Sequence, residues 1–175
     1  MHAANLLKAQ AELAYSELLG CIKDLDEKLA WAKVECQPGE YLHSEGSILS
    51  LVYHIAGGKS VYGGWAYRNH ERGWGFTVEA MEKYWPSWNA AKDCLAEAHE
   101  YWMNSWSQES DFERLVDRFN GEKQPSWKII TTVTQHDVYH GGQIQVLRST
   151  LAPTDNPPPE EGDLWRKYCA ELPSW

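Results

Sequence analysis

The stretch Gln135-His136-Asp137-Val138-Tyr139-His140-Gly141-Gly142-Gln143 decides how the rest of this chain is interpreted. It lies in a proline-free run from Trp127 to Leu151 with apolar residues at helical spacing, which predicts a long helix with Ser126 as its N-cap. In that helix His136 and His140, four residues apart, share one face with their Cβ atoms about 6 Å apart. Two imidazoles at this spacing are common in helical metal sites, although chance also produces such pairs.

A third histidine, His54, lies in the apolar run from Ile48 to Gly58, which also predicts a buried helix. By itself, a histidine among Leu, Val and Ile is more often a hydrogen-bonded core residue than a ligand. Set opposite His136 and His140, it would complete a three-histidine site. Three neutral imidazoles leave a tetrahedral metal ion one open position, which is typical of catalytic rather than structural sites.

The length of 175 residues predicts a single domain, residues 1–175, with a core at 4–151 and a C-terminal tail at 152–175. A net charge of −9 without a basic cluster argues against nucleic acid and anionic membranes as partners. No apolar run approaches the length of about 18 residues needed to span a bilayer, and the N-terminus lacks the features of a signal peptide. We therefore expect a cytoplasmic protein whose four scattered cysteines are free thiols, mainly in the core.

The apolar spacing predicts four long helices, at 4–32, from a cap at Ser44 or Ser47 to Arg68, at 78–106 with a kink or break at Pro86, and at 127–151. Such helices predict an all-α fold, a four-helix bundle, and bundles build metal sites from side chains on facing helices.

The remaining segments give weaker signals. Asp111–Val116 predicts either one helical turn or a short extended segment, and Asn120-Gly121 predicts a turn. The tail predicts one short helix at 164–170. The four costly helix glycines indicate either close helix approach or room for a ligand beside His54; they are Gly57, Gly58, Gly63 and Gly64.

Two motifs carry a resemblance to a known family, Leu51-Val52-Tyr53-His54-Ile55-Ala56-Gly57 and His136-Asp137-Val138-Tyr139-His140-Gly141-Gly142-Gln143-Ile144. Over residues 4–151 the chain resembles the DinB superfamily, which includes the YfiT-like proteins described as metal-dependent hydrolases. The family pattern is H-x-x-x-H followed by a variable residue and Gly-Gln. Gly141 stands where the family frequently has Arg, so no substrate-binding role is carried over to that position.

The resemblance implies an up-down-down-up four-helix bundle, commonly a homodimer, with a divalent metal ion, zinc or nickel, on His54, His136 and His140. Related members include bacillithiol S-transferases and mycothiol-dependent maleylpyruvate isomerase. The implied function is therefore a thiol-dependent S-transferase or isomerase with a low-molecular-weight thiol as cosubstrate, or a hydrolase. Two alternatives stay open: a non-catalytic metal-binding or dimerisation module, and a plain helical bundle whose three histidines are hydrogen-bonded core residues.

Other polar residues are assigned by their place on the predicted helices. Gln143 shares the face of His136 and His140, so it is a candidate to orient a ligand or hold an imidazole, or else a polar residue in a helix interface. Asp137, one residue off that face, is expected to be solvated, and Arg148 is expected on the surface. Four further histidines are expected to be surface residues: His2, His43, His70 and His99. The ten tryptophans predict core positions and a dimer interface.

Overall fold

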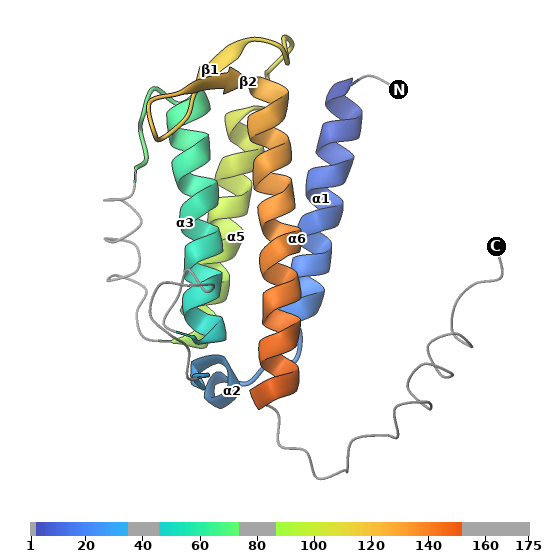
Figure 1. The fold of residues 1–175 in the computed structure, drawn as a ribbon, viewed down its shortest axis with the longest axis vertical. Helices are drawn as coiled ribbons and strands as arrows, with labels where there is room; N and C mark the ends of the chain where they lie inside the picture. The colour runs from blue at the N-terminus through green and yellow to red at the C-terminus, as the bar shows by residue number, and fades with distance from the viewer. Residues whose placement is uncertain (1–2, 35–45, 74–86, 152–175) are drawn as a thin grey trace, which may run out of the picture.

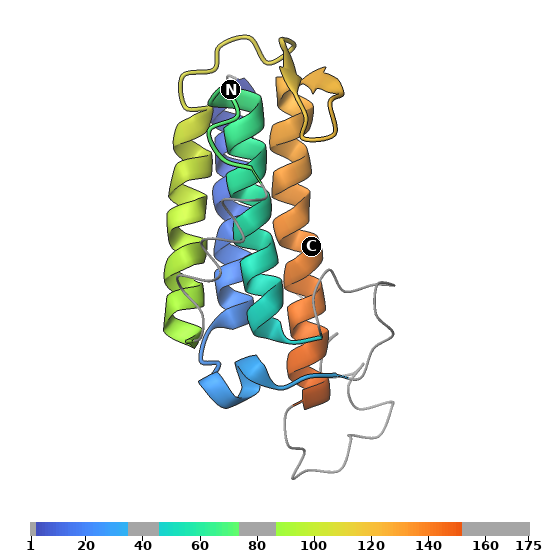
Figure 2. The ribbon, with the colours of Figure 1, turned by 90° about the vertical axis from the view of Figure 1, so that its left-hand side faces the viewer.

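The computed structural model describes residues 3–34, 46–73 and 87–151, and these are mostly helical. Four long helices pack side by side (Figures 1 and 2): α1 (Ala3–Ile22), α3 (Ile48–Tyr67), α5 (Trp88–Ser105) and α6 (Ser126–Leu151). A short helix, α2 (Glu27–Trp31), lies at one end, and a hairpin of β1 (Leu115–Asp117) and β2 (Lys123–Pro125) lies at the other. The all-α class is thus confirmed for the described residues.

Helices α1 and α6 run in one direction and α3 and α5 in the other (Figure 1). Side-chain contacts agree with this arrangement. Tyr67, at the end of α3, donates a hydrogen bond to the carbonyl oxygen of Ser126, at the start of α6. Arg148, near the end of α6, donates to the carbonyl oxygen of Cys21, near the end of α1. The two helices that carry the three histidines, α3 and α6, are therefore antiparallel neighbours.

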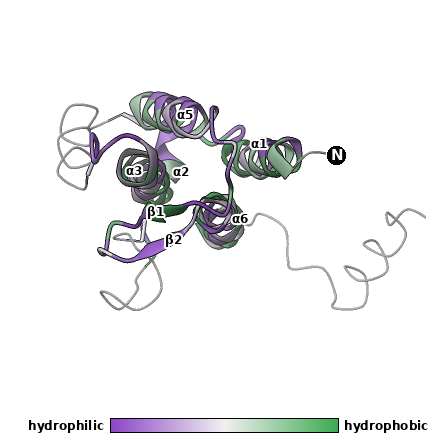
Figure 3. Cartoon of the chain, turned by 90° about the horizontal axis from the view of Figure 1, so that it is seen from above, coloured by the Kyte–Doolittle hydropathy of each residue, from purple (hydrophilic) through white to green (hydrophobic). Residues whose placement is uncertain are grey.

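The view from above shows one long helix at each corner of the bundle (Figure 3). Helix α3 is the most enclosed, because sixteen of its twenty residues are buried. The apolar core forms two clusters. One surrounds Leu18, Leu51 and Ile144, and the other surrounds Trp102 and Ile130. Between the two apolar clusters, several of the buried side chains of α3 and α6 are polar.

The first helix is shorter than the sequence predicted. A helix was expected at 4–32, but α1 ends at Ile22 and the chain turns at Asp24, whose φ of 59° is incompatible with a continuous helix. The side chain of Asp26 then accepts a hydrogen bond from the Leu29 amide and caps α2. The apolar spacing continues through this turn because Leu25 and Ala30 pack into the same core, which explains the misplaced boundary.

The other helix boundaries agree more closely. Of the two predicted caps for α3, Ser47 accepts from the Ser50 amide at 3.2 Å. Helix α5 begins after its cap Ser87 and ends at Ser105, one residue before the predicted end; the predicted start and Pro86 lie outside the described residues, as does the tail helix at 164–170. The extended alternative for Asp111–Val116 holds for its last two residues, in β1, and Gly121 takes the turn conformation with φ of 83°.

Two of the helix glycines have a packing reason. A Cβ added at Gly64 would collide with the backbone of Arg72, and one added at Gly63 would lie 2.9 Å from Ser105 Oγ and 3.0 Å from the Tyr101 ring. Close packing against neighbouring segments therefore explains both glycines, which confirms the first of the two predicted explanations at these positions. Among the described residues, none of the helices combines the length and the apolar character that crossing a bilayer requires.

Candidate metal centre

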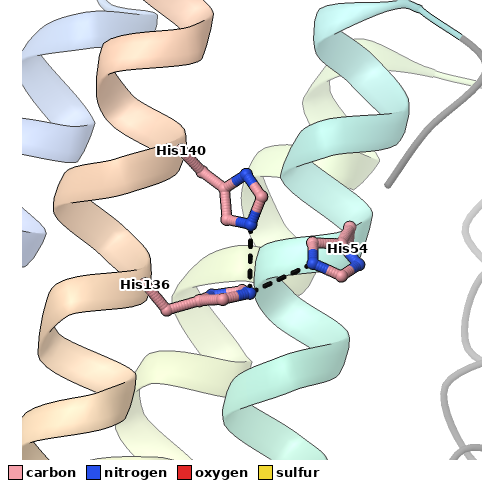
Figure 4. Close-up of side chains that lie close together, drawn as sticks. All are labelled: His54, His136 and His140. Atoms are coloured by element: carbon pink, nitrogen blue, oxygen red, sulfur yellow. Dashed lines mark hydrogen bonds between the residues drawn. The ribbon is translucent and has the colours of Figure 1, made fainter. Parts of the chain in front are cut away.

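The three predicted histidines come together between α3 and α6 (Figure 4). His136 Nε2 lies 3.0 Å from His54 Nε2 and 3.1 Å from His140 Nε2. In the part of the chain that the structure describes, this is the only group of three or more His, Cys, Asp or Glu side chains close enough to hold an ion. His140 is fully buried, whereas His54 and His136 are partly exposed, so the cluster lies at the edge of the core and faces solvent on one side.

A glycine on the facing helix makes room for the central histidine. A Cβ placed on Gly58 would lie 3.1 Å from His136 Cε1, so the imidazole packs directly against the backbone of α3. One of the sequence explanations for this glycine was room for a ligand beside His54. The structure instead places the His136 ring in that space.

Gln143 orients the buried imidazole. Its Oε1 lies 2.6 Å from His140 Nδ1, and its Nε2 donates to the Tyr139 hydroxyl at 3.1 Å. A carbonyl oxygen only accepts, so the neutral imidazole carries its proton on Nδ1 and presents the lone pair of Nε2 toward His136. Residues that fix a tautomer in this way commonly support metal-ligating histidines.

The donor set fits a divalent cation. Without a cation, His136 Nε2 faces two other imidazole nitrogens at hydrogen-bond distance, and a single proton on it would be shared between them. A metal ion accepts all three lone pairs. With zinc–nitrogen bonds of about 2.0–2.1 Å, two ligands in a tetrahedral site are separated by about 3.3 Å. Two of the three pairs, at 3.0 and 3.1 Å, are within a few tenths of that value. The three candidate ligand atoms all lie within 4.8 Å of one another, so His54 and His140 would move closer together to share a tetrahedral ion.

Asp137 was expected to be solvated, and that prediction is wrong. Its side chain is 2% exposed and accepts a hydrogen bond from Lys59 Nζ at 2.5 Å, in an ion pair between α6 and α3. Burial raises the pKa of the Asp137 carboxyl and lowers the pKa of the Lys59 ammonium, and the attraction between the two groups opposes both shifts. The Asp137 carboxylate therefore forms an ion pair with Lys59 and is not one of the candidate metal ligands.

His99 and Arg148 also differ from the prediction of surface positions. The His99 ring is partly buried on α5 and stacks on Tyr15 of α1 with ring centroids 3.5 Å apart. Burial, together with the smaller effect of the positive charge of Lys59, lowers the pKa of His99 to about 3. Arg148 is partly buried and donates a hydrogen bond to the carbonyl oxygen of Cys21 in α1. His70 is exposed as expected, and His2 and His43 lie outside the described residues.

Sequence reasoning missed Lys59 and did not assign a contact to Tyr139. Lys59 carried a usable signal, because a lysine in the middle of an apolar run needs a buried counter-charge or a path to water. Tyr139 carried no signal beyond its place four residues before Gln143. Of the predicted tryptophan positions, the core assignment holds for Trp88, Trp102 and Trp106, whereas Trp127 is 40% exposed.

The chain matches no protein-family model, no curated protein and no solved structure.

Proposed function

We propose that this chain is a divalent-metal-binding protein of the DinB type, in which His54, His136 and His140 hold one zinc or nickel ion. The observation that carries the proposal is the convergence of three imidazole nitrogens from two antiparallel helices, with 3.0 and 3.1 Å between neighbours. The order of helix directions, with α1 and α6 opposed to α3 and α5, supports it because the resemblance implies that order.

Metal analysis tests the first part of the proposal. Untagged protein, purified and then reconstituted with zinc or nickel, is expected to hold about one equivalent of metal per chain after desalting. A content below about 0.2 equivalents for both metals would exclude a site of useful affinity. Such a result would favour the alternative of three hydrogen-bonded core histidines.

The proposed activity is a thiol-dependent transfer or isomerisation. When bound, a divalent ion supplies the Lewis acidity that makes a thiol or water ligand nucleophilic near neutral pH. The residues of the chain fit this role, because three neutral imidazoles leave the charge of the ion uncompensated. Asp137, the carboxylate between the two histidines of the motif, is buried and paired with Lys59, so it does not neutralise the ion. The partly exposed His54 and His136 leave one side of the cluster open to a cosubstrate.

Cobalt-substituted protein tests whether the site takes a thiol. Absorption spectra are recorded with cysteine, glutathione, bacillithiol and mycothiol, and a thiolate-to-cobalt charge-transfer band is expected with at least one of them. His54→Ala serves as the control and is expected to lose the band together with the metal. Tight cobalt binding with no response to any of these thiols would refute the thiol-dependent activity and favour a non-catalytic metal-binding module.

The homodimer is also part of the proposal. Large apolar side chains are exposed on the adjacent helices α1 and α6, including Leu13, Val138 and Val146 at 62%, 59% and 66% exposure. Such residues support a contact with a second copy, since paired surfaces would remove them from water. Light scattering is expected to give twice the chain mass of 20.1 kDa, and Val146→Glu is expected to shift the equilibrium toward monomer. A wild-type monomer at tens of micromolar would contradict this.

A further inference from the structure

The bundle interior holds an ion pair beside the candidate metal centre that the proposed function does not use. Lys59 of α3 and Asp137 of α6 lie 2.5 Å apart, with side chains 1% and 2% exposed. Each directly follows in sequence a residue of the histidine cluster or one that packs against it. Lys59 follows Gly58, against which the His136 ring packs, and Asp137 follows His136 itself.

The pair lies at a level where side chains of all four long helices approach one another. Lys59 Nζ lies 5.4 Å from the centre of the Tyr15 ring of α1, and that ring stacks on His99 of α5. One residue from each long helix therefore meets at this level, between the two apolar clusters of the core. Both members of the pair are almost fully buried at this level.

Stability alone is a poor explanation for this pair. Removing a lysine and an aspartate from water is costly, and well-packed apolar side chains of similar size are often equally stable in their place. The pair is also incompletely satisfied, since Asp137 Oδ1 has no hydrogen-bond partner among the described residues. A feature that contributes little net stability calls for another role.

The geometry points to helix registration. Apolar contacts are not directional, so the packing of side chains such as Ile130 and Ile144 tolerates small rotations and shifts of α6. A charged hydrogen bond fixes both direction and distance. Consecutive helical residues point about 100° apart, so fixing Asp137 toward α3 also fixes the direction in which His136 and His140 point.

We infer that the Lys59–Asp137 pair sets the rotation and register of α6 against α3, and so holds His136 and His140 opposite His54. Both members are positioning residues, which touch neither the metal nor a substrate. This inference rests on the proposed metal site.

The test separates positioning from stability. The variants are Lys59→Met, Asp137→Leu and the double variant, each compared with wild type for thermal midpoint, zinc affinity by chelator competition and the spectrum of the cobalt form. Each single variant leaves a buried charge without its partner and is expected to lower the midpoint strongly. The double variant is expected to recover most of the midpoint, yet to bind zinc at least about tenfold more weakly and to show an altered cobalt spectrum.

Leu95→Ala is the matched control, because Leu95 is fully buried on α5, which carries none of the three histidines. It is expected to lower the midpoint without a change in zinc affinity. Asp137→Asn keeps an acceptor oxygen for Lys59 and is expected to bind zinc within about threefold of wild type, whereas Lys59→Met removes the hydrogen bond and is expected to lose at least about tenfold. These two variants decide the question if the double variant does not fold, because equal zinc affinities of the two, measured at a temperature at which both are folded, would overturn the inference.

The outcomes distinguish the two proposals. A folded double variant with wild-type zinc affinity and an unchanged cobalt spectrum would overturn the positioning role and leave the metal site intact. A wild-type protein that does not bind zinc, nickel or cobalt would overturn both. Weakened zinc binding in Leu95→Ala equal to that of the double variant would also overturn the inference, because stability loss would then account for the effect.

Discussion

Replacing Gly58 with alanine tests the candidate metal centre without removing a ligand. The new Cβ would lie 3.1 Å from His136 Cε1, about 0.3 Å short of the 3.4 Å at which ordinary van der Waals contact begins. Most residues of α3 are buried, and a side chain rotates more easily than a packed helix shifts, so the imidazole is expected to move by about this amount. Bond lengths in metal sites tolerate deviations of about 0.2 Å, so the expected shift exceeds the tolerance.

The stability of the metal-free protein and its zinc affinity are expected to respond differently, because the substitution has two opposing effects on the free energy of unfolding. Alanine gains about 1 kcal/mol over glycine within a helix, and a displaced side chain costs about 0.5–1.5 kcal/mol. The free energy of unfolding of the metal-free protein is therefore expected to change by less than about 1 kcal/mol. Zinc affinity is expected to fall about tenfold, which corresponds to about 1.4 kcal/mol.

The assay measures zinc affinity by chelator competition and stability by urea unfolding of the metal-free protein. Gly142→Ala is the matched control, because a Cβ there meets nothing within 4 Å although the residue is only two positions from His140. It is expected to keep wild-type zinc affinity and to gain stability. Unchanged zinc affinity in Gly58→Ala would refute the reasoning, since His136 would then not be a ligand held against α3.

Three further predictions follow from the same structure. His54→Ala is expected to weaken zinc binding by several kcal/mol, since the two remaining imidazoles hold the ion poorly, whereas His99→Ala is expected to keep wild-type zinc affinity. Isothermal titration calorimetry measures both affinities, and equal losses would show that the wrong histidine was assigned. Gly64→Ala is expected to destabilise the fold by about 2–3 kcal/mol because its Cβ would collide with the backbone of Arg72. Gly20→Ala, with open space around the new Cβ, is expected to stabilise the fold by up to about 1 kcal/mol. Urea unfolding measures both changes, and an unchanged stability of Gly64→Ala would contradict the close packing at that position. His99 has a folded-state pKa of about 3, below its ordinary 6.5, so between these pH values the unfolded chain binds a proton that the native protein does not, and stability is lost as pH falls from 6.5 toward 3. His99→Phe is expected to reduce that loss by about half of the 1.4 kcal/mol per pH unit that one fully buried group would give, because the ring is partly exposed. An unchanged dependence of stability on pH would count against the burial of His99.

Much of the architecture was predictable because helical periodicity is a local property of the chain. The run from Trp127 to Leu151 predicts α6 to within one residue, and the i, i+4 spacing places His136 and His140 on one face whatever surrounds them. The cap at Ser47 is equally local. Boundaries failed where apolar spacing continued through a turn, as at Asp24, because burial of the next segment in the same core imitates a longer helix.

The sequence by itself determined most of the helix positions, the side of α6 that carries two histidines, and the three histidines that form the cluster. Only the tertiary structure decided that Asp137 is buried, that its partner is Lys59, 78 residues away, and that Gly58 provides the space for the His136 ring. The physical reason is that a helix face gains its environment from its neighbours. A residue 100° from the ligand face reaches solvent or core according to which helix packs there, and local spacing carries no information about that choice.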